Sequence, residues 1–335
     1  MPTKIEWAEE TWNPVVGCAK VSTGCKNCYA ERMARRLKAM GILQYQDVID
    51  KNGWTNKISL VPKALEKPLH WRKSKRIFVC SMSDLFHKDV PFWFVRSIWT
   101  TMAMCTQHIF MVLTKRPERM LEFVNREWPT EVIYEHQVQR YTEQVRATMQ
   151  DVLPNVWLGV TAENQETANE RIPILLQIPA AVRFVSLEPL LGPVDLYRAV
   201  YGPPSSFLLS TGAYGWPDYC NIRNINGLCG RGENGGLNWI IAGGESGPGA
   251  RPVNVDWLRS VRDQCTRSGT SFLFKQWGAW AVYESVDGRG PLPRGQVHWF
   301  DEPTGAPDMV RVGKKAAGRK LDGREWNEYP KMRKE

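Results

Sequence analysis

Short apolar segments alternate with amphipathic segments along most of this chain, and the alternation predicts an α/β protein. The apolar segments are rich in β-branched or aromatic residues and nearly continuous in hydrophobicity, as parallel strands buried on both faces must be. They lie at residues 76–81, 108–114, 156–161, 182–187, 237–243 and 271–275. Helical patterns separate several of them, at residues 91–105, 118–124, 168–176 and 255–268. This order predicts parallel strands joined by helical crossovers.

A further short strand is expected close to the N-terminus, running into a loop at Cys18, which brings the total to about seven. That number favours a partial or complete (β/α) TIM-type barrel. The barrel-like domain is expected over residues 1–278, with an irregular Gly- and Pro-rich insertion at residues 201–236. The alternation stops at residue 279, so residues 279–335 are predicted to form a C-terminal extension that packs on the barrel.

The composition is that of an ordinary globular protein. Hydrophobic residues make up 43% of the chain, enough for an ordinary buried core, and no apolar run approaches the length that spans a membrane. The first residues lack the apolar centre of a secretory signal. We therefore expect a cytoplasmic protein without membrane contact, in a compartment where thiols stay reduced.

Three cysteines near the N-terminus carry the strongest chemical indication. Cys18, Cys25 and Cys28 lie in one loop between the first predicted strand and a helix expected over residues 27–40, which Gly41 ends. Structural zinc is closed by four protein ligands, whereas three ligands leave one coordination position open. A cubane iron–sulfur cluster on three cysteines likewise keeps one iron accessible. The spacing therefore predicts a metal-binding site, with an iron–sulfur cluster favoured over zinc.

Two other interpretations of these cysteines are less favoured. A disulfide framework is disfavoured, because eight cysteines in 335 residues is sparse. Structural zinc needs a fourth ligand from afar, since the nearest histidine is His70. Cys80, Cys105 and Cys265 are expected to be core residues. Cys220 and Cys229 are expected to be thiols without metal, although the sequence leaves open whether they bind a second metal.

Polar residues follow each predicted strand at its C-terminal end, which is where β/α barrels carry their reacting groups. We expect them to line a common mouth. The candidates are Ser81, Ser83, Asp84, Lys115, Arg116, Glu163, Asn164, Glu188, Gly243, Gly244, Glu245, Lys275 and Gln276.

The cysteine loop resembles the cluster-binding loop of the radical S-adenosylmethionine (radical SAM) superfamily, where three cysteines after the first barrel strand hold a [4Fe–4S] cluster. The superfamily spacing is C-x3-C-x2-C. Here six residues separate Cys18 from Cys25, while Cys25 and Cys28 keep the two-residue gap and Tyr29 follows instead of preceding the third cysteine. More closely, the chain resembles a phage-associated family of unknown function with a three-Cys motif, through residues 243–247, 274–278 and 313–318.

The resemblance implies two cofactors, a [4Fe–4S] cluster on Cys18, Cys25 and Cys28 and S-adenosyl-L-methionine on the open iron. An external donor such as flavodoxin or ferredoxin would supply one electron, and cleavage of the cofactor would give a 5′-deoxyadenosyl radical. By the same resemblance, a polar group after the second strand meets the methionine amine. Ser81, Ser83 and Asp84 occupy that place in this chain.

Further cofactor contacts are expected from residues that follow the later strands. Gly243 and Gly244, followed by Glu245, would let the backbone approach the adenosine, because glycine has no side chain to obstruct it. Ribose or substrate contacts are expected from Glu163, Asn164 and Glu188. For Glu188 and Glu245 a salt bridge at the barrel rim is an equal alternative, and Lys115 and Arg116 either hold a carboxylate or phosphate or form a rim pair. Catalytic residues are not assigned.

The charge is positive and unevenly distributed, with 44 Lys and Arg against 35 Asp and Glu. Residues 63–76 carry six basic residues against one acid, and residues 311–335 carry nine against four. Such clusters are typical of nucleic-acid binders, although they also occur as solvated faces of no specific use. We expect a radical SAM enzyme that modifies or repairs nucleic acid or a nucleotide. The alternative is a non-catalytic nucleic-acid-binding protein with a structural zinc or iron–sulfur site.

Overall fold

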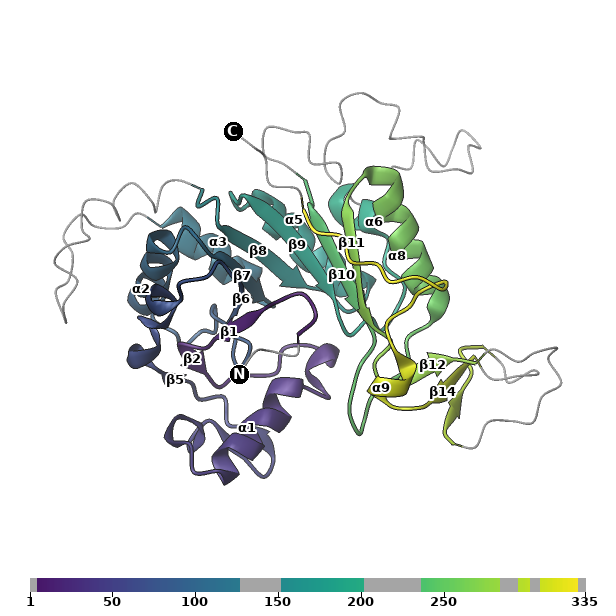
Figure 1. Ribbon diagram of the computed structural model, residues 1–335, viewed down its shortest axis with the longest axis horizontal. Coiled ribbons are helices and arrows are strands. Elements are labelled where there is room, and N and C mark those ends of the chain that lie inside the picture. The colour runs from purple at the N-terminus through teal and green to yellow at the C-terminus, as the bar shows by residue number, and fades with distance from the viewer. Residues whose placement is uncertain (1–4, 127–151, 202–235, 284–294, 302–307, 331–335) are drawn as a thin grey trace. The chain divides into compact units, whose positions relative to one another are not determined.

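The computed structural model describes residues 5–126, 152–201, 236–283, 295–301 and 308–330 (Figure 1). Its main sheet has seven parallel strands in the order β1-β6-β7-β8-β9-β10-β11. Each strand of this sheet neighbours the one that follows it along the chain, and helices connect most of them. This is the topology of a partial (β/α) barrel, and it confirms the predicted fold class. The strands are β1 (Glu10–Trp12), β6 (Arg76–Val79), β7 (Ile109–Thr114), β8 (Val156–Thr161), β9 (Val182–Leu187), β10 (Trp239–Gly243) and β11 (Ser271–Gln276).

The helices agree closely with the periodicity of the sequence. The strands at residues 156–161 and 182–187 and the helix at residues 255–268 have the predicted bounds, and the short helices α6 and α9 were not anticipated. The α-helices are α1 (Tyr29–Ala39), α2 (Phe92–Met104), α3 (Pro117–Asn125), α5 (Gln165–Gln177), α6 (Leu196–Tyr201), α8 (Val255–Ser268) and α9 (Lys314–Ala317). The 3-10 helices are η1 (Thr23–Cys25), η2 (Leu43–Tyr45), η3 (Pro62–Ala64) and η4 (Lys67–His70). Nearly all of the predicted insertion at residues 201–236 lies outside the described residues.

The chain divides into two compact units, which are described separately. The first unit comprises Met1–Val21, Ala30–Val160 and Ile174–Arg183. The second comprises Ser22–Tyr29, Thr161–Pro173 and Phe184–Glu335. The division passes through the cysteine loop, so Cys18 belongs to the first unit and Cys25 and Cys28 belong to the second. A domain boundary at residue 279 stays a prediction.

The core of the first unit is built from buried side chains of its strands and of the helices α2 and α3. Phe94 and Ile98 of α2 and Phe110 of β7 are completely buried. The indole of Trp12, at the end of β1, is also buried and donates to Ala64 O at 2.6 Å. Burial of each such side chain is worth about 1.5–3 kcal/mol, so this core fixes the ends of β1 and β6.

A second apolar cluster seats α1, the helix that follows the cysteines. Ala34 of α1 packs in a buried group with Val16, Val48, Ile49 and Met82. Two short antiparallel ladders border this cluster, β2 (Val15–Val16) with β5 (Ser59–Leu60) and β3 (Ile49–Asp50) with β4 (Gly53–Trp54). The helix ends as predicted, because Gly41 adopts the left-handed conformation with φ 77° just beyond it.

In the second unit, α8 packs against β10 and β11 (Figure 1). Its first turn is capped by Asn254, whose side chain accepts from Asp256 N at 2.8 Å. The chain after residue 325 runs along the outer edge of β11, where Phe274 N donates to Trp326 O at 3.0 Å. It therefore covers an edge strand that would otherwise be open to pairing. A separate antiparallel sheet has the order β12 (Trp280–Val282), β14 (Met309–Arg311) and β13 (Val297–His298).

Within the described part of the chain, every helix is too short or too polar to cross a membrane.

Candidate metal centre

The three cysteines follow a tight turn of the chain. Gly17 has φ 93°, and an added Cβ there would lie 2.4 Å from Lys57 O, so only glycine fits. Cys18 comes next, Cys25 ends the short helix η1, and Cys28 immediately precedes the first residue of α1. All three are half-buried thiols that are not joined in disulfides. None of the three is therefore fully buried in the core.

The other described cysteines differ from these three. Cys80, Cys105 and Cys265 are buried. Burial raises the pKa of the Cys80 thiol to about 12 and that of the Cys105 thiol to about 11, so both stay protonated at neutral pH. They behave as core residues, as the sequence predicted, while Cys220 and Cys229 lie outside the described residues.

In the described ranges, no three His, Cys, Asp or Glu side chains are gathered as ligands of a single metal ion. The convergence of the three sulfurs on one cluster therefore stays a prediction. The structure does show what holds each half of the loop.

In the first unit, the turn after β6 anchors the segment that leads to Cys18. Ser81 Oγ and Met82 N both donate to Asn13 Oδ1, at 3.1 and 3.0 Å. Ser83 Oγ donates to Val15 O at 3.0 Å. Two of the predicted cofactor residues, Ser81 and Ser83, thus use their hydroxyls to brace the strand-to-loop segment.

Asp84, which follows the same end of β6, is buried and accepts four hydrogen bonds. Its Oδ1 accepts from Thr114 Oγ1 at 2.7 Å and from Phe86 N at 3.0 Å. Its Oδ2 accepts from Lys115 N at 3.0 Å and from Arg116 Nη1 at 2.7 Å. Because four donors already engage this carboxylate, a methionine amine would have to displace one of them, and binding of the amine by Asp84 stays a prediction.

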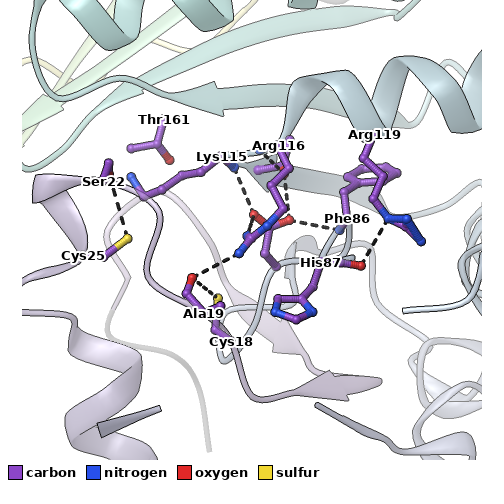
Figure 2. Close-up of polar contacts among 12 residues, drawn as sticks. Cys18, Ala19, Ser22, Cys25, Phe86, His87, Lys115, Arg116, Arg119 and Thr161 are labelled. Carbon is purple, nitrogen blue, oxygen red and sulfur yellow. Dashed lines mark hydrogen bonds and ion pairs between the residues drawn. The ribbon is translucent and has the colours of Figure 1, made fainter. Parts of the chain in front are cut away.

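Arg116 links Asp84 to the segment of the first cysteine. Its Nη2 donates to Ala19 O at 3.1 Å, and the Cys18 thiol donates to the same oxygen at 3.5 Å (Figure 2). Burial would lower the pKa of the guanidinium, but the charge of the hydrogen-bonded Asp84 carboxylate raises that pKa above its ordinary value. Arg116 thus forms an ion pair with Asp84, and its predicted role in holding a carboxylate or phosphate of a ligand stays a prediction.

Glu163 plays the corresponding part in the second unit, at the end of β8. Its side chain is completely buried, and Oε1 accepts from Ser22 Oγ in the cysteine loop at 2.7 Å. Arg171 Nη1 lies 3.3 Å from Oε2 and also donates to Thr161 O at 2.7 Å. A Cβ added to Gly24 would come within 2.3 Å of Glu163 Oε1, so the loop lies directly on the carboxylate.

Glu245, after β10, holds the other end of the loop. Asn27 Nδ2 donates to Oε2 at 2.8 Å, and Arg251 donates to both carboxylate oxygens, with Nη2 2.7 Å from Oε1. Arg251 Nη2 also donates to Thr23 O at 3.0 Å. Burial would raise the pKa of this carboxyl, but its hydrogen bonds to Arg251 and Asn27 lower it below its ordinary value. The rim salt bridge predicted as an alternative for Glu245 is therefore present.

Glu188 forms the other predicted rim pair. Lys275 Nζ lies 2.8 Å from Glu188 Oε2, and Gln276 Nε2 donates to Oε1 at 3.0 Å. Asn164 caps α5, because its Oδ1 accepts from Thr167 N at 3.0 Å. A ribose or substrate contact from either residue stays a prediction.

The paired glycines after β10 are explained by packing within the fold. A Cβ on Gly244 would lie 2.0 Å from Trp277 O, and one on Gly243 would lie 3.1 Å from Gln276 O. Gly244 is therefore required by the close approach of the chain that leaves β11, whereas a side chain at position 243 would be tight there. Their predicted contact with adenosine has no test in this structure.

The sequence did not identify the partners that complete these braces: Ser22, Asn27, Arg171 and Arg251. Ser22 and Asn27 lie inside the cysteine loop itself. Their position beside the cysteines was therefore the one signal in the sequence that could have identified them as part of the site. Arg171 lies in α5 and Arg251 lies in the loop before α8, and no local pattern connects either to a carboxylate.

Comparisons with known proteins identify a family. A family model described as a protein of unknown function, DUF5131, matches residues 2–330. Comparison with curated proteins gives no match. Among solved structures, a spore photoproduct lyase complexed with dinucleoside spore photoproduct is similar at a TM-score of 0.37 and 10% identity, over 91% of this chain and 68% of that one. Since the family model spans nearly the whole chain, the protein belongs to the DUF5131 family.

Proposed function

We propose that this protein is a radical SAM enzyme whose [4Fe–4S] cluster is held by Cys18, Cys25 and Cys28. The observation that carries the proposal is one loop of three half-buried thiols, braced in each unit by a carboxylate from a strand end. The partial (β/α) barrel supplies the scaffold, because its strands end beside the segments that the carboxylates hold.

The chemistry of the donor set fits the cluster. Cysteine thiolates are the usual ligands of [4Fe–4S] clusters, and three of them leave one iron open for a small chelating molecule. Zinc also binds thiolates, but a structural zinc site uses four protein ligands. S-adenosylmethionine, bound to the open iron and given one electron, would yield methionine and a 5′-deoxyadenosyl radical.

The chain's own residues would hold the loop before any ligand arrives. Arg116, paired with Asp84, holds Ala19 beside Cys18. Glu163 holds Ser22, and Glu245 with Arg251 holds Thr23 and Asn27. Side chains locked in this way keep ligands near their binding geometry, which a bare loop of this length would not do.

We propose a nucleic acid or nucleotide as substrate, because the described basic segments expose several cations. Lys63 and Lys67 lie in η3 and η4 with their side chains in solvent, and Arg72 and Lys73 follow. By contrast Lys75 is paired with Glu10 at 2.9 Å. Exposed cations bind phosphates without regard to sequence.

The proposal is tested by anaerobic reconstitution with iron and sulfide, followed by dithionite and S-adenosylmethionine. We expect a brown protein with about four irons per chain and the release of 5′-deoxyadenosine. A matched variant, Cys25→Ala, should release none. A colourless protein that holds zinc and gives no 5′-deoxyadenosine would refute the proposal and favour the alternative, a non-catalytic nucleic-acid-binding protein with a structural zinc site.

A further inference from the structure

We propose that Gln276, Lys275 and Glu188 form a recognition site for the edge of an amine-bearing nucleobase such as cytosine. The inference deepens the proposed function and rests on it for the class of substrate, a nucleic acid or nucleotide. All three residues lie in the second unit, at the C-terminal ends of β9 and β11. The site needs neither the cysteine loop nor a cofactor.

An irregularity in β11 turns two successive side chains toward one carboxylate. Gly243 of β10 pairs with Gln276 after a shift of register that leaves Lys275 as an extra residue in β11. Successive side chains of a regular strand point to opposite faces, whereas a bulge re-aims them. Lys275 Nζ lies 2.8 Å from Glu188 Oε2, and Gln276 Nε2 donates to Glu188 Oε1 at 3.0 Å.

Both side chains reach Glu188 across β10, the strand between β9 and β11 (Figure 1). The last residue of β10 is Gly243, and an added Cβ there would lie 3.5 Å from Lys275 Cβ. A larger side chain at position 243 would therefore occupy the space beside the stem of the lysine. The glycine keeps the path from Lys275 to Glu188 open.

Gln276 Oε1 is a buried acceptor for which none of the described residues supplies a donor. The residue is only 5% exposed. The orientation of its amide is settled, because a carboxylate only accepts and Nε2 must therefore face Glu188. A buried acceptor without a donor costs free energy, and an N–H group of a ligand would recover it.

The neighbouring ion pair supplies further hydrogen-bonding groups. The ammonium of Lys275 has more donors than the one that Glu188 accepts, and each oxygen of the Glu188 carboxylate has a second lone pair. The side chains of Lys275 and Glu188 are 16% and 15% exposed. Two acceptors and one donor thus lie together, and both partners of Glu188 are held in place by the same carboxylate.

These groups favour a neutral ligand with a donor beside an acceptor. Phosphate is disfavoured, because Glu188 offsets the charge of Lys275 and an ionised phosphate cannot donate to Gln276 Oε1. The amino group of cytosine or adenine has two N–H donors, one for Gln276 and one for Glu188, and the ring nitrogen beside it accepts from Lys275. Enzymes that act on a base read its Watson–Crick edge through hydrogen bonds of this kind.

The test compares cytidine with its analogue in which hydrogen replaces the amino group. Affinities are measured by saturation-transfer NMR on the full-length protein without reconstitution. We expect the wild type to bind cytidine more tightly than the analogue. In Gln276→Met, the affinity for cytidine should fall about 2- to 12-fold, as loss of one neutral hydrogen bond predicts, while the affinity for the analogue stays the same.

The matched control is Gln264→Met, which replaces another buried glutamine of the second unit. Gln264 Oε1 accepts from Leu196 N at 2.7 Å, and its Nε2 donates to Val194 O at 3.0 Å. Because both ends of this amide are engaged within the fold, Gln264→Met should lower the stability of the protein and leave its affinity for cytidine unchanged.

Equal affinities of the wild type for cytidine and the analogue overturn the inference, whether or not Gln276→Met folds. Failure of the wild type to bind cytidine overturns it too, as does an equal loss of both ligands in Gln276→Met. Displacement of cytidine by inorganic phosphate would show an anion site instead. A protein that assembles no cluster refutes the radical SAM proposal but leaves this comparison intact, because the metal-free protein is used.

Discussion

Ser22 Oγ donates a 2.7 Å hydrogen bond to Glu163 Oε1, joining the cysteine loop to the end of β8. The carboxylate that accepts it has no exposed surface, and its second oxygen lies 3.3 Å from Arg171 Nη1. The position of the cysteine loop therefore depends on the buried ion pair between Glu163 and Arg171. A loop that carries metal ligands would benefit, because a buried pair cannot be loosened without a large loss of free energy.

The first prediction concerns this pair. Replacing Glu163 by alanine leaves the Arg171 charge buried without its carboxylate, and we expect a loss of about 3–5 kcal/mol in the free energy of unfolding. Ser22→Ala removes only a hydrogen bond and should cost about 0.5–1.5 kcal/mol. Urea unfolding measures both. Equal losses for the two variants would show that the ion pair does not support the loop.

The second prediction concerns Gly24, whose added Cβ would lie 2.3 Å from Glu163 Oε1. Gly24→Ala must push the loop away from the carboxylate, so we expect a loss of about 1–3 kcal/mol of stability and a lower iron content after reconstitution. Lys26→Ala is the control, since this neighbouring side chain is exposed. If the two variants bind iron equally well, the close fit between loop and carboxylate is unimportant for the site.

Much of the fold could be predicted because its strands are buried on both faces. The strands β8 and β9 are continuously apolar, so the sequence shows clearly where each begins and ends. Their predicted bounds agree with the structure. The helix α8 was equally clear, since an N-cap asparagine and a left-handed glycine mark its two ends. The helix α6 was missed because its six residues are too few to establish a periodicity.

The site was predictable in its residues more than in their contacts. Carboxylates at strand ends were identified from position alone, but their partners come from segments far away in sequence, as Ser22 does for Glu163. Likewise, glycine is required at position 244 because the backbone oxygen of Trp277 lies so close. The local sequence pattern gives no signal of such a contact. The local sequence predicts which side chains lie at the strand ends, but it does not predict which residues these side chains contact.

The third prediction uses the difference in burial among the thiols. In the metal-free protein, iodoacetamide should modify the three loop cysteines well before Cys80 and Cys105, because the latter two are buried and their pKa values are raised to about 12 and about 11. Mass spectrometry of the digested protein gives the order of modification. After reconstitution with iron and sulfide, the loop cysteines should become protected. Continued modification at the unreconstituted rate would contradict their role as ligands.

The fourth prediction is a pH dependence set by Glu245. Its pKa is lowered in the folded protein from the ordinary value of 4.5, so the unfolded chain binds more protons in the window between the two values. The stability that it contributes is present above pH 4.5 and is lost as the pH falls through the folded value. We expect the stability difference between the wild type and Glu245→Gln to shrink on acidification below that pH. A difference that stays constant from neutral to acidic pH would contradict this assignment.

The last prediction concerns a polyanionic partner. Lys315 and Lys320 are exposed, whereas Arg319 is engaged by Asn327 through a hydrogen bond, so the two lysines are the better candidates for phosphate contacts. Replacing both by alanine should weaken binding to DNA or RNA and reduce the slope of log K against log salt by about 2, since each phosphate contact contributes roughly one. The double variant Lys51→Ala and Lys88→Ala removes the same charge from exposed positions outside the basic segments and should leave the slope near the wild-type value. Equal slopes for the two double variants would show that the C-terminal cations do not contact phosphates. If the wild-type protein binds no nucleic acid even at low salt, a nucleic-acid polymer is excluded as the substrate, and a nucleotide or other small molecule takes its place.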